Sequence, residues 1–156
     1  MVHDDSGLHF DDLAIGSSFK TTGRTVTEAD LVAFVNCTGL TGPLFTNVEF
    51  LKTQSAISGR PVPGALAFTW SEAFCASGPM RGTGLALLKV EIDFETAVQV
   101  GDTIHCEAEV VELRRSKSRP GAGIVRFRNR VVTQDGVVAI TYHATRLIKA
   151  RPTRHA

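Results

Sequence analysis

Two candidate chemical features of the 156-residue chain lie in the apolar segment between Pro63 and Gly78. Glu72 is the only charged residue of this segment, and a buried carboxylate must find a partner, take up a proton or lie at an edge. The dipeptide Pro63-Gly64 opens the segment, where the free N–H groups of a helix start favour partial negative charge. Pro63 and Gly64 are also ordinary residues for starting a helix, so both interpretations stay open.

Other reactive side chains have simpler interpretations. His105 alternates with apolar neighbours and is predicted to face solvent, whereas the facing of His143 is ambiguous because both phases of its strand are apolar or small. Cys37, Cys75 and Cys106 lack the CxxC or Cys/His spacing of a metal site. We interpret them as buried thiols in a reducing compartment, and we expect neither a metal nor a cofactor.

Composition limits the kinds of partner. The chain has 17 basic and 16 acidic residues and a formal net charge of +1, which removes the electrostatic drive for non-specific nucleic-acid binding. No window approaches the roughly 20 apolar residues of a membrane span, and the N-terminus lacks the features of a signal peptide. We therefore expect a cytoplasmic protein that binds neither nucleic acid nor membrane.

The first half of the chain is predicted to be helical. Thr27 with Asp30 forms a variant of the capping box, and Gly39 provides a helix stop. A shorter helix is expected over residues 48–55, which leaves residues 38–47 as a loop. The segment 63–76 has almost no polar face, and a helix that is apolar all round is buried.

The second half of the chain has the two-residue period of strands. Apolar and charged residues alternate over residues 87–94, 104–110 and 125–131, and a last strand is expected over 137–148. With an early strand at 19–24, these segments form an antiparallel sheet with one wet face. The helix over 63–76 must cover the dry face. The sequence therefore predicts a single α+β domain over residues 1–156, with flexible ends at 1–9 and 150–156.

A curved sheet around one buried helix, with "GxxF", "TVTEAD", "GPLFTN" and "PVPGAL" in that order, resembles the hot-dog fold of the MaoC-like acyl-CoA hydratase/dehydratase family. The resemblance extends from Phe10 to Leu147. It implies an enzyme like the (R)-specific enoyl-CoA hydratases, in which an Asp and a His activate the water that adds across an enoyl thioester.

The family motif Gly-Asp-x-Asn-Pro-x-His-x-Asp matches residues 39–47 with both proton-transfer groups replaced. Leu40 stands at the Asp position, Phe45 at the His position and Asn47 at the final Asp. Neither replacement transfers protons, and each positioned acid or base contributes on the order of 10²–10⁴ to a rate. The resemblance thus implies an acyl pocket lined by Leu40, Phe45, Thr46 and Asn47 without the standard dyad; Thr46 and Asn47 are equally suited to capping the loop.

The resemblance also assigns roles to other residues. Gly64 would hold the thioester carbonyl oxygen with a backbone N–H, as the corresponding residue does in the family. Some hot-dog thioesterases use a carboxylate on the central helix, which makes Glu72 a weak catalytic candidate, and His143 is a weaker one. The basic residues Arg114, Arg115, Lys117 and Arg119 are candidates for binding the phosphates of coenzyme A, although a solvated loop explains them equally well.

We therefore expect a protein that binds an acyl-CoA or acyl-carrier thioester, with coenzyme A entering only as part of the ligand. The alternatives are a thioesterase that uses Glu72 and a non-catalytic subunit of a hetero-oligomeric hydratase with a catalytic homologue. Because acyl sites of this family form at subunit interfaces, the resemblance also implies a homodimer or a larger homo-oligomer.

Overall fold

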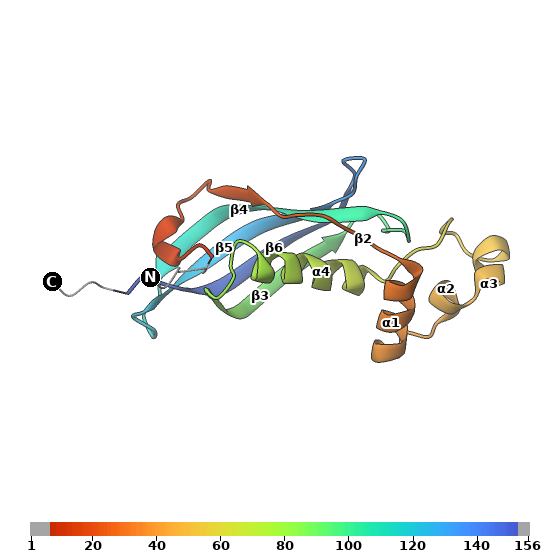
Figure 1. The fold of residues 1–156 in the computed structure, drawn as a ribbon, viewed down its shortest axis with the longest axis horizontal. Coiled ribbons are helices and arrows are strands. Elements are labelled where there is room, and N and C mark those ends of the chain that lie inside the picture. Colours follow the sequence, from red (N-terminus) through yellow and green to blue (C-terminus); the bar gives the residue numbers. More distant parts are fainter. Residues whose placement is uncertain (1–6, 153–156) are drawn as a thin grey trace, which may run out of the picture.

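The computed structural model describes residues 7–152, and it shows a curved antiparallel sheet wrapped around one central helix (Figure 1). The strand order is β1-β4-β5-β6-β3. Strand β2 also pairs with β4, at residues 103–104, whereas β1 pairs with residues 107–109 of the same strand. The predicted hot-dog architecture is confirmed. The helices are η1 (Phe10–Asp12), α1 (Glu28–Thr38), α2 (Pro43–Thr46), α3 (Val48–Thr53) and α4 (Gly64–Ser77); the strands are β1 (Ser18–Lys20), β2 (Arg24–Thr25), β3 (Gly84–Phe94), β4 (Thr103–Arg115), β5 (Ala122–Val132) and β6 (Val138–Lys149).

Helix α4 is the apolar segment predicted to be buried, and it lies along the concave face of the sheet (Figure 1). Leu66, Ala67, Ser71 and Cys75 are all almost completely buried, and their spacing places them on the face that meets the strands. Of the described helices, neither α4 nor any other is long and apolar enough to cross a membrane. The sheet therefore has its cover, and α4 has its apolar environment.

Helix α1 begins and ends as its sequence predicts. The Thr27 hydroxyl accepts a hydrogen bond from the Asp30 N–H, and the Asp30 carboxylate accepts one from the Thr27 N–H. Gly39 ends the helix in the left-handed conformation, with a φ of 75°. After it the predicted loop contains the short helix α2, and α1 to α3 form a lobe beyond the sheet near the start of α4 (Figure 1).

Strands β4, β5 and β6 alternate between buried and exposed side chains, as predicted. Their outer face has cross-strand ion pairs, with Arg126 on Glu91, Arg128 on Glu109 and Arg130 on Glu107. The early strand expected over residues 19–24 is divided into β1 and β2. The long strands thus form a sheet with one dry and one charged face.

Strand β3 differs from the prediction of a half-buried strand, because most of its side chains are exposed. It lies at the edge of the sheet, and β6 is its one partner among the described strands, so none of those strands covers its other side. Leu85, Leu87, Leu88 and Phe94 are between 46% and 57% exposed. A long edge strand with exposed leucines is the least covered part of the sheet.

The N-terminal segment packs against the sheet where it is described, although the sequence predicts a flexible end at 1–9. The Gly7 N–H donates to the Arg81 carbonyl, and Phe10 is 7% exposed against β5. The polar composition of the segment does not predict this packing, because a single aromatic side chain, that of Phe10, supplies the contact with the sheet. The remainder of the two predicted flexible ends, residues 1–6 and 153–156, lies outside the described residues.

The contact between Phe10 and β5 gives a stability prediction. A Cβ atom built on Gly123 would lie 1.9 Å from the Phe10 Cδ2 atom, so we expect Gly123→Ala to displace the ring and lower the free energy of unfolding by about 1–3 kcal/mol. Gly121→Ala is the matched control, because its Cβ would meet nothing within 4 Å. Urea denaturation of both variants measures the difference, and equal stability would contradict the proposed anchor.

Candidate functional site

The start of helix α4 presents unpaired backbone donors. Among the described residues, no group accepts a hydrogen bond from the N–H of Gly64 or Ala65, whereas the Leu66 N–H donates to the Pro63 carbonyl. The Phe94 ring lies directly against Gly64, since a Cβ atom there would be 2.6 Å from two ring carbons. Glycine is therefore the residue that fits, and its backbone is positioned to meet a small acceptor group.

A pocket of about 260 Å³ lies beside this helix start, and it brings together two of the residues singled out in the sequence. Phe45 and Gly64 both line it, so the α2 loop and the N-terminus of α4 face one space. The other lining residues are almost all apolar. They are Leu44, Ile57, Pro61, Val62, Ala67, Phe94, Glu95, Thr96, Ala97, Val98 and Ile140.

Glu95 is the one titratable residue among the described residues that line this pocket, and its carboxylate is directed elsewhere. The Glu95 Oε1 atom accepts a hydrogen bond from the Thr141 hydroxyl. Thr141 precedes the buried Tyr142 on β6, so it lies on the outer face of the sheet. Among the described residues that line the pocket, none therefore has a titratable side chain directed into it.

The four residues predicted to line an acyl pocket are in different positions. Phe45 is in the pocket wall, but Leu40 is 41% exposed and lies outside the set of lining residues. The Thr46 hydroxyl donates to the carbonyls of Thr41 and Gly42, and the Asn47 side chain caps α3 by accepting from the Phe50 N–H. Thr46 and Asn47 thus fix the loop that presents Phe45.

Arg60 holds the same loop from the other side, and the sequence analysis did not identify it. Its Nη1 donates to the Phe45 carbonyl at 2.8 Å, while its Nε and Nη2 bind the Glu28 carboxylate. The hydrogen bond from Arg60 lowers the pKa of Glu28. Arg60 thereby ties α1 to the pocket wall. No sequence motif marks Arg60, because its partners lie 15 and 32 residues away.

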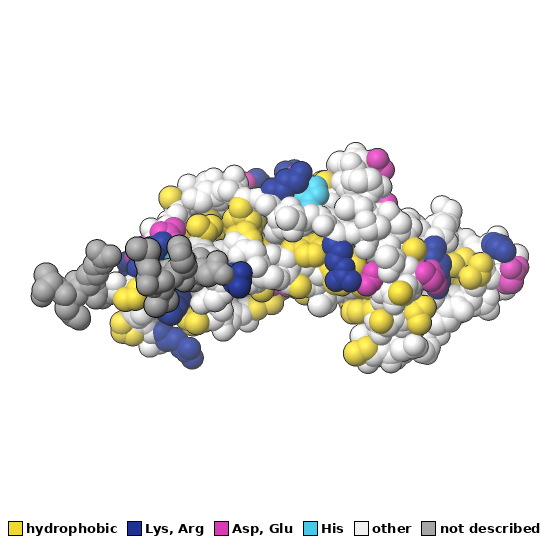
Figure 2. Space-filling view, in the orientation of Figure 1, with side chains coloured by type: hydrophobic (Ala, Val, Ile, Leu, Met, Phe, Trp, Pro, Cys, Tyr) yellow, Lys and Arg dark blue, Asp and Glu magenta, His cyan; other side chains and the backbone are white. Residues whose placement is uncertain are grey.

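The space-filling view shows apolar side chains gathered on the surface around α1 and α2 (Figure 2). Val32, Leu40 and Val48, which belong to this lobe, are between 41% and 51% exposed. Cys37 on α1 is also exposed, which corrects the prediction that all three thiols are buried. The lobe is small, so one side of each of its short helices faces solvent.

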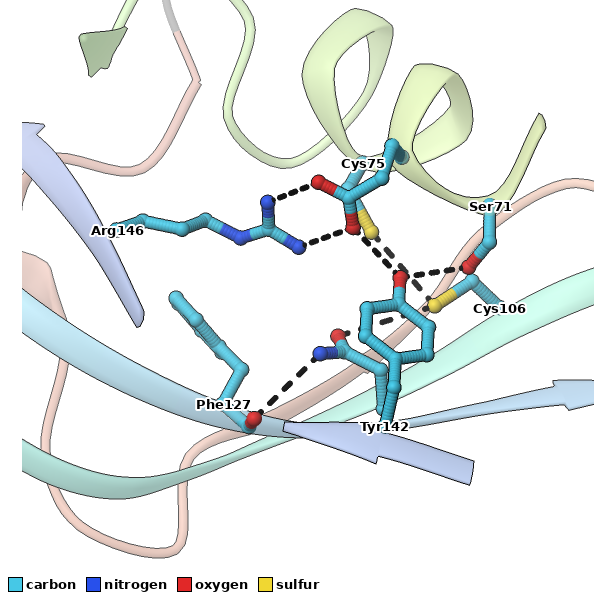
Figure 3. Close-up of polar contacts among 8 residues, drawn as sticks. Ser71, Cys75, Cys106, Phe127, Tyr142 and Arg146 are labelled. Carbon is cyan, nitrogen blue, oxygen red and sulfur yellow. Dashed lines mark hydrogen bonds and ion pairs between the residues drawn. The ribbon is translucent and has the colours of Figure 1, made fainter. Parts of the chain in front are cut away.

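Glu72 is not at the pocket beside Gly64. Its carboxylate accepts hydrogen bonds from both terminal nitrogens of Arg146, one at 2.6 Å, and from the Tyr142 hydroxyl at 2.7 Å (Figure 3). The Tyr142 hydroxyl also pairs with Ser71 at 2.8 Å. Burial raises the pKa of Tyr142, so its hydroxyl stays protonated. The sequence left three outcomes for the Glu72 carboxylate, namely a partner, a bound proton or a position at an edge. The structure shows a partner.

This ion pair lines a second, separate groove of about 490 Å³ between α4 and the edge strand β3. The Glu72 side chain is 18% exposed and that of Arg146 is 7% exposed. Apolar and small residues such as Ala73, Met80 and Leu87 form most of the remaining wall. The pocket beside Gly64 and the groove beside Glu72 share no lining residue, so within one chain the Gly64 backbone and the Glu72 carboxylate do not belong to one site.

The two histidines lie on the outer side of the sheet. His143 on β6 is half-buried and stands opposite Glu91 of β3 and Arg128 of β5. His105 is also half-buried, with its Nε2 atom 3.2 Å from the Glu107 carboxylate. Neither histidine lines the pocket beside Gly64.

The candidate phosphate-binding residues gather at the end of the β4–β5 hairpin, whereas the start of α4 lies away from it, on the side of the α1–α3 lobe (Figure 1). Arg115 pairs with Asp11, and its guanidinium lies 5.0 Å from the centre of the Phe10 ring. Arg114, Lys117 and Arg119 belong to the same hairpin end. Within one chain, this basic group and the pocket do not form one site.

Comparison with known proteins agrees with the fold. The family model described as "FAS1-like, dehydratase domain region" matches residues 13–142. An (R)-specific enoyl-CoA hydratase of Rhodospirillum rubrum is 28% identical over 152 residues, which are 97% of this chain and 99% of that protein.

Two solved structures are similar over nearly the whole chain. The MaoC-like dehydratase from Rhodospirillum rubrum is 25% identical with a TM-score of 0.81, covering 94% of this chain and 99% of that one. A conserved hypothetical protein from Mycobacterium tuberculosis, described as a double hotdog fold, has 21% identity and a TM-score of 0.84 over 96% of this chain and 46% of its own. The second likeness supports the fold alone.

The buried ion pair gives a prediction that separates structure from catalysis. We expect Glu72→Gln to lower the free energy of unfolding by about 3–5 kcal/mol, because it leaves the Arg146 guanidinium buried without its counter-charge. Glu109→Gln removes one member of the exposed pair with Arg128 and should cost at most about 1 kcal/mol. Chemical denaturation at neutral pH measures both. Equal losses would mean that the Glu72 pair is effectively solvated.

Proposed function

The chain belongs to the MaoC-like hydratase/dehydratase family, and from that premise we propose that it binds an acyl thioester in the pocket beside Gly64 without the family's standard hydration chemistry. The observation that carries the proposal is that Phe45 and Gly64 line one apolar pocket at a helix N-terminus. The ligand is an acyl-CoA or an acyl-carrier thioester, met in the cytoplasm.

The pocket suits both parts of such a ligand. The thioester carbonyl oxygen accepts hydrogen bonds from the free N–H groups of Gly64 and Ala65, and the helix start favours its partial negative charge. The acyl chain contacts Phe45, Ile57 and Phe94, where each buried CH₂ contributes about 0.8 kcal/mol. The polar end therefore fixes the orientation of the ligand, while the apolar end supplies affinity.

The same geometry argues against hydration by the usual route. Water addition needs an acid and a base beside the double bond. The resemblance places Leu40 and Phe45 at the motif positions of those groups, and of the two only Phe45 lines the pocket. The one titratable residue among the described lining residues, Glu95, has its carboxylate on Thr141. A thioesterase that uses Glu72 is also less well supported, because its carboxylate is bound to Arg146 in the other groove.

We expect isothermal titration calorimetry to detect crotonyl-CoA binding that free coenzyme A does not reproduce. Ile57→Glu should weaken that binding at least about tenfold, because the ligand would bury a carboxylate. Ile57 is 39% exposed, so the variant should fold. Ile15→Glu is the control, since Ile15 is 71% exposed and lies outside the pocket.

The two halves of the proposal fail separately in this experiment. If neither the wild-type chain nor the Ile15→Glu variant binds the thioester, the ligand assignment is wrong. If the purified chain binds crotonyl-CoA and also converts it to the hydroxyacyl product, another acid–base group replaces the missing dyad. Binding without turnover is the expected result.

We further propose that the edge strand β3 pairs with a second copy of this chain. The strand exposes its backbone edge and several leucines, which is a surface suited to strand addition. Antiparallel pairing about Val90 would place Lys89 opposite the partner's Glu91, so the charges of the strand complement those of its own copy. This self-complementarity favours a homodimer over a complex with a catalytic homologue.

The oligomer prediction is tested by sedimentation velocity. The wild-type chain should sediment as a dimer, and Leu87→Glu should shift it towards the monomer, because pairing about Val90 places residue 87 opposite the Asp93 carboxylate of the second copy. Val137→Glu is the control, because Val137 is similarly exposed at the β5–β6 turn, outside β3. A monomeric wild type, or a Leu87→Glu variant that stays dimeric, would contradict the assignment of this edge.

A further inference from the structure

We propose that Cys75 and Cys106 are a site of reversible oxidation, at which a mild peroxide-type oxidant forms a disulfide that links helix α4 to strand β4. This proposal is independent of the ligand and the oligomeric state. It rests on the position of the two thiols in the core and on the polar groups around them.

The two sulfur atoms already lie in contact. Cys75 on α4 and Cys106 on β4 face each other across the helix–sheet interface, with their Sγ atoms 3.6 Å apart (Figure 3). Both residues are 0% exposed. A disulfide has an S–S length of about 2.05 Å, so the sulfurs must approach by about 1.5 Å. Small changes in side-chain torsion on the two elements can supply such a movement.

The surroundings of this pair are more polar than those of ordinary buried thiols. The Cys106 Sγ atom lies 4.0 Å from the Asn129 Oδ1 atom, and the hydroxyls of Ser71 and Tyr142 are close by (Figure 3). The hydrogen bond from Cys75 lowers the pKa of Cys106, with further contributions from those two hydroxyls. The thiolate is the reactive form of cysteine, so Cys106 is the thiol that reacts first.

The alternation of apolar and polar residues along β4 does not indicate that the pKa of Cys106 is lowered. For Cys75, the hydrogen bond with Cys106 raises the pKa of the thiol, and burial raises it further. Cys106 differs because its partners come from α4, β5 and β6. Glu72 is the charged group that acts against the Cys106 thiolate.

The chemistry balances with hydrogen peroxide as the oxidant. The Cys106 thiolate attacks one peroxide oxygen, the O–O bond breaks, and the departing hydroxide takes up the proton that the Cys106 thiol had lost, so that a sulfenic acid and one water form. The Cys75 sulfur then attacks the sulfenic sulfur, the S–O bond breaks, and a second water leaves as the S–S bond forms. Two thiols are oxidised and one peroxide is reduced to two waters. A small thiol reductant reverses the step by exchange.

Access for the oxidant comes from the groove between α4 and β3. Met80, which belongs to the same core cluster as the two cysteines, lines that groove. Local opening at this boundary admits a molecule as small as peroxide. The resulting bond closes a loop between residues 31 positions apart that includes the whole of β3. Closing a loop of this length reduces the entropy of the unfolded chain and stabilises the fold.

The test uses the full chain with Cys37→Ser, which removes the exposed thiol. After treatment with dilute hydrogen peroxide, intact-mass spectrometry should show the loss of two hydrogen atoms, and a non-reducing peptide map should link the Cys75 and Cys106 peptides. The melting temperature should rise by roughly 5–10 °C. Dithiothreitol should restore the original mass and melting temperature.

Two controls keep the result interpretable. Cys37→Ser with Cys75→Ala should not lose two hydrogens, and Cys37→Ser with Cys106→Ala serves if the first control misfolds, as judged by circular dichroism. The proposal is overturned if the folded Cys37→Ser protein keeps its mass under peroxide. It is also overturned if that protein only gains oxygen atoms, or if the linked peptides come from two different chains.

Discussion

Helix α4 has almost no polar face, and the rest of the fold follows from the burial of the side that meets the sheet. Leu66, Ala67, Ser71 and Cys75 are buried there, whereas Ala65, Thr69 and Ala73 on the other side of the helix are exposed. The sheet curves, and β1 and β2 continue the cover where they pair with β4. Two clusters of buried side chains result, one towards each end of α4.

The few polar groups that α4 brings into this core determine its rotation and its position along the sheet. Ser71, Glu72 and Cys75 each meet a particular partner, namely Tyr142, Arg146 and Cys106. A turn of the helix about its axis would bury a carboxylate without its counter-charge, which is far more costly than a shift among alkyl contacts. The polar cluster thus gives the helix a single register.

That register has consequences at the far end of α4, where the pocket lies. Once the helix is fixed, the Gly64 backbone meets the Phe94 ring, and Gly64 lines the same pocket as Leu44 and Phe45 of α2. Phe94 ends the edge strand, and the segment after it continues the pocket wall. The exposed edge strand is therefore continuous with the wall of the pocket beside Gly64.

The sequence by itself identified the elements. These elements depend on residues that are close together in the sequence. Examples are the two-residue period over 87–94 and 125–131, the apolar helix at 63–76, and the helix caps at Thr27 and Gly39. These features recur in the structure, with the bounds shifted by a few positions. The family resemblance then supplied the curved sheet around the helix and the expectation that Phe45 and Gly64 belong to one acyl site.

Only the tertiary structure decided which groups meet across long distances in the chain. Glu72 finds Arg146, 74 residues away, and Arg60 finds the Phe45 carbonyl and Glu28. The same applies to β3, whose alternation is that of a covered strand although it lies at the edge. Local periodicity records which face of an element is apolar. Partner identity depends on strand order and register, which arise from the packing of the whole chain.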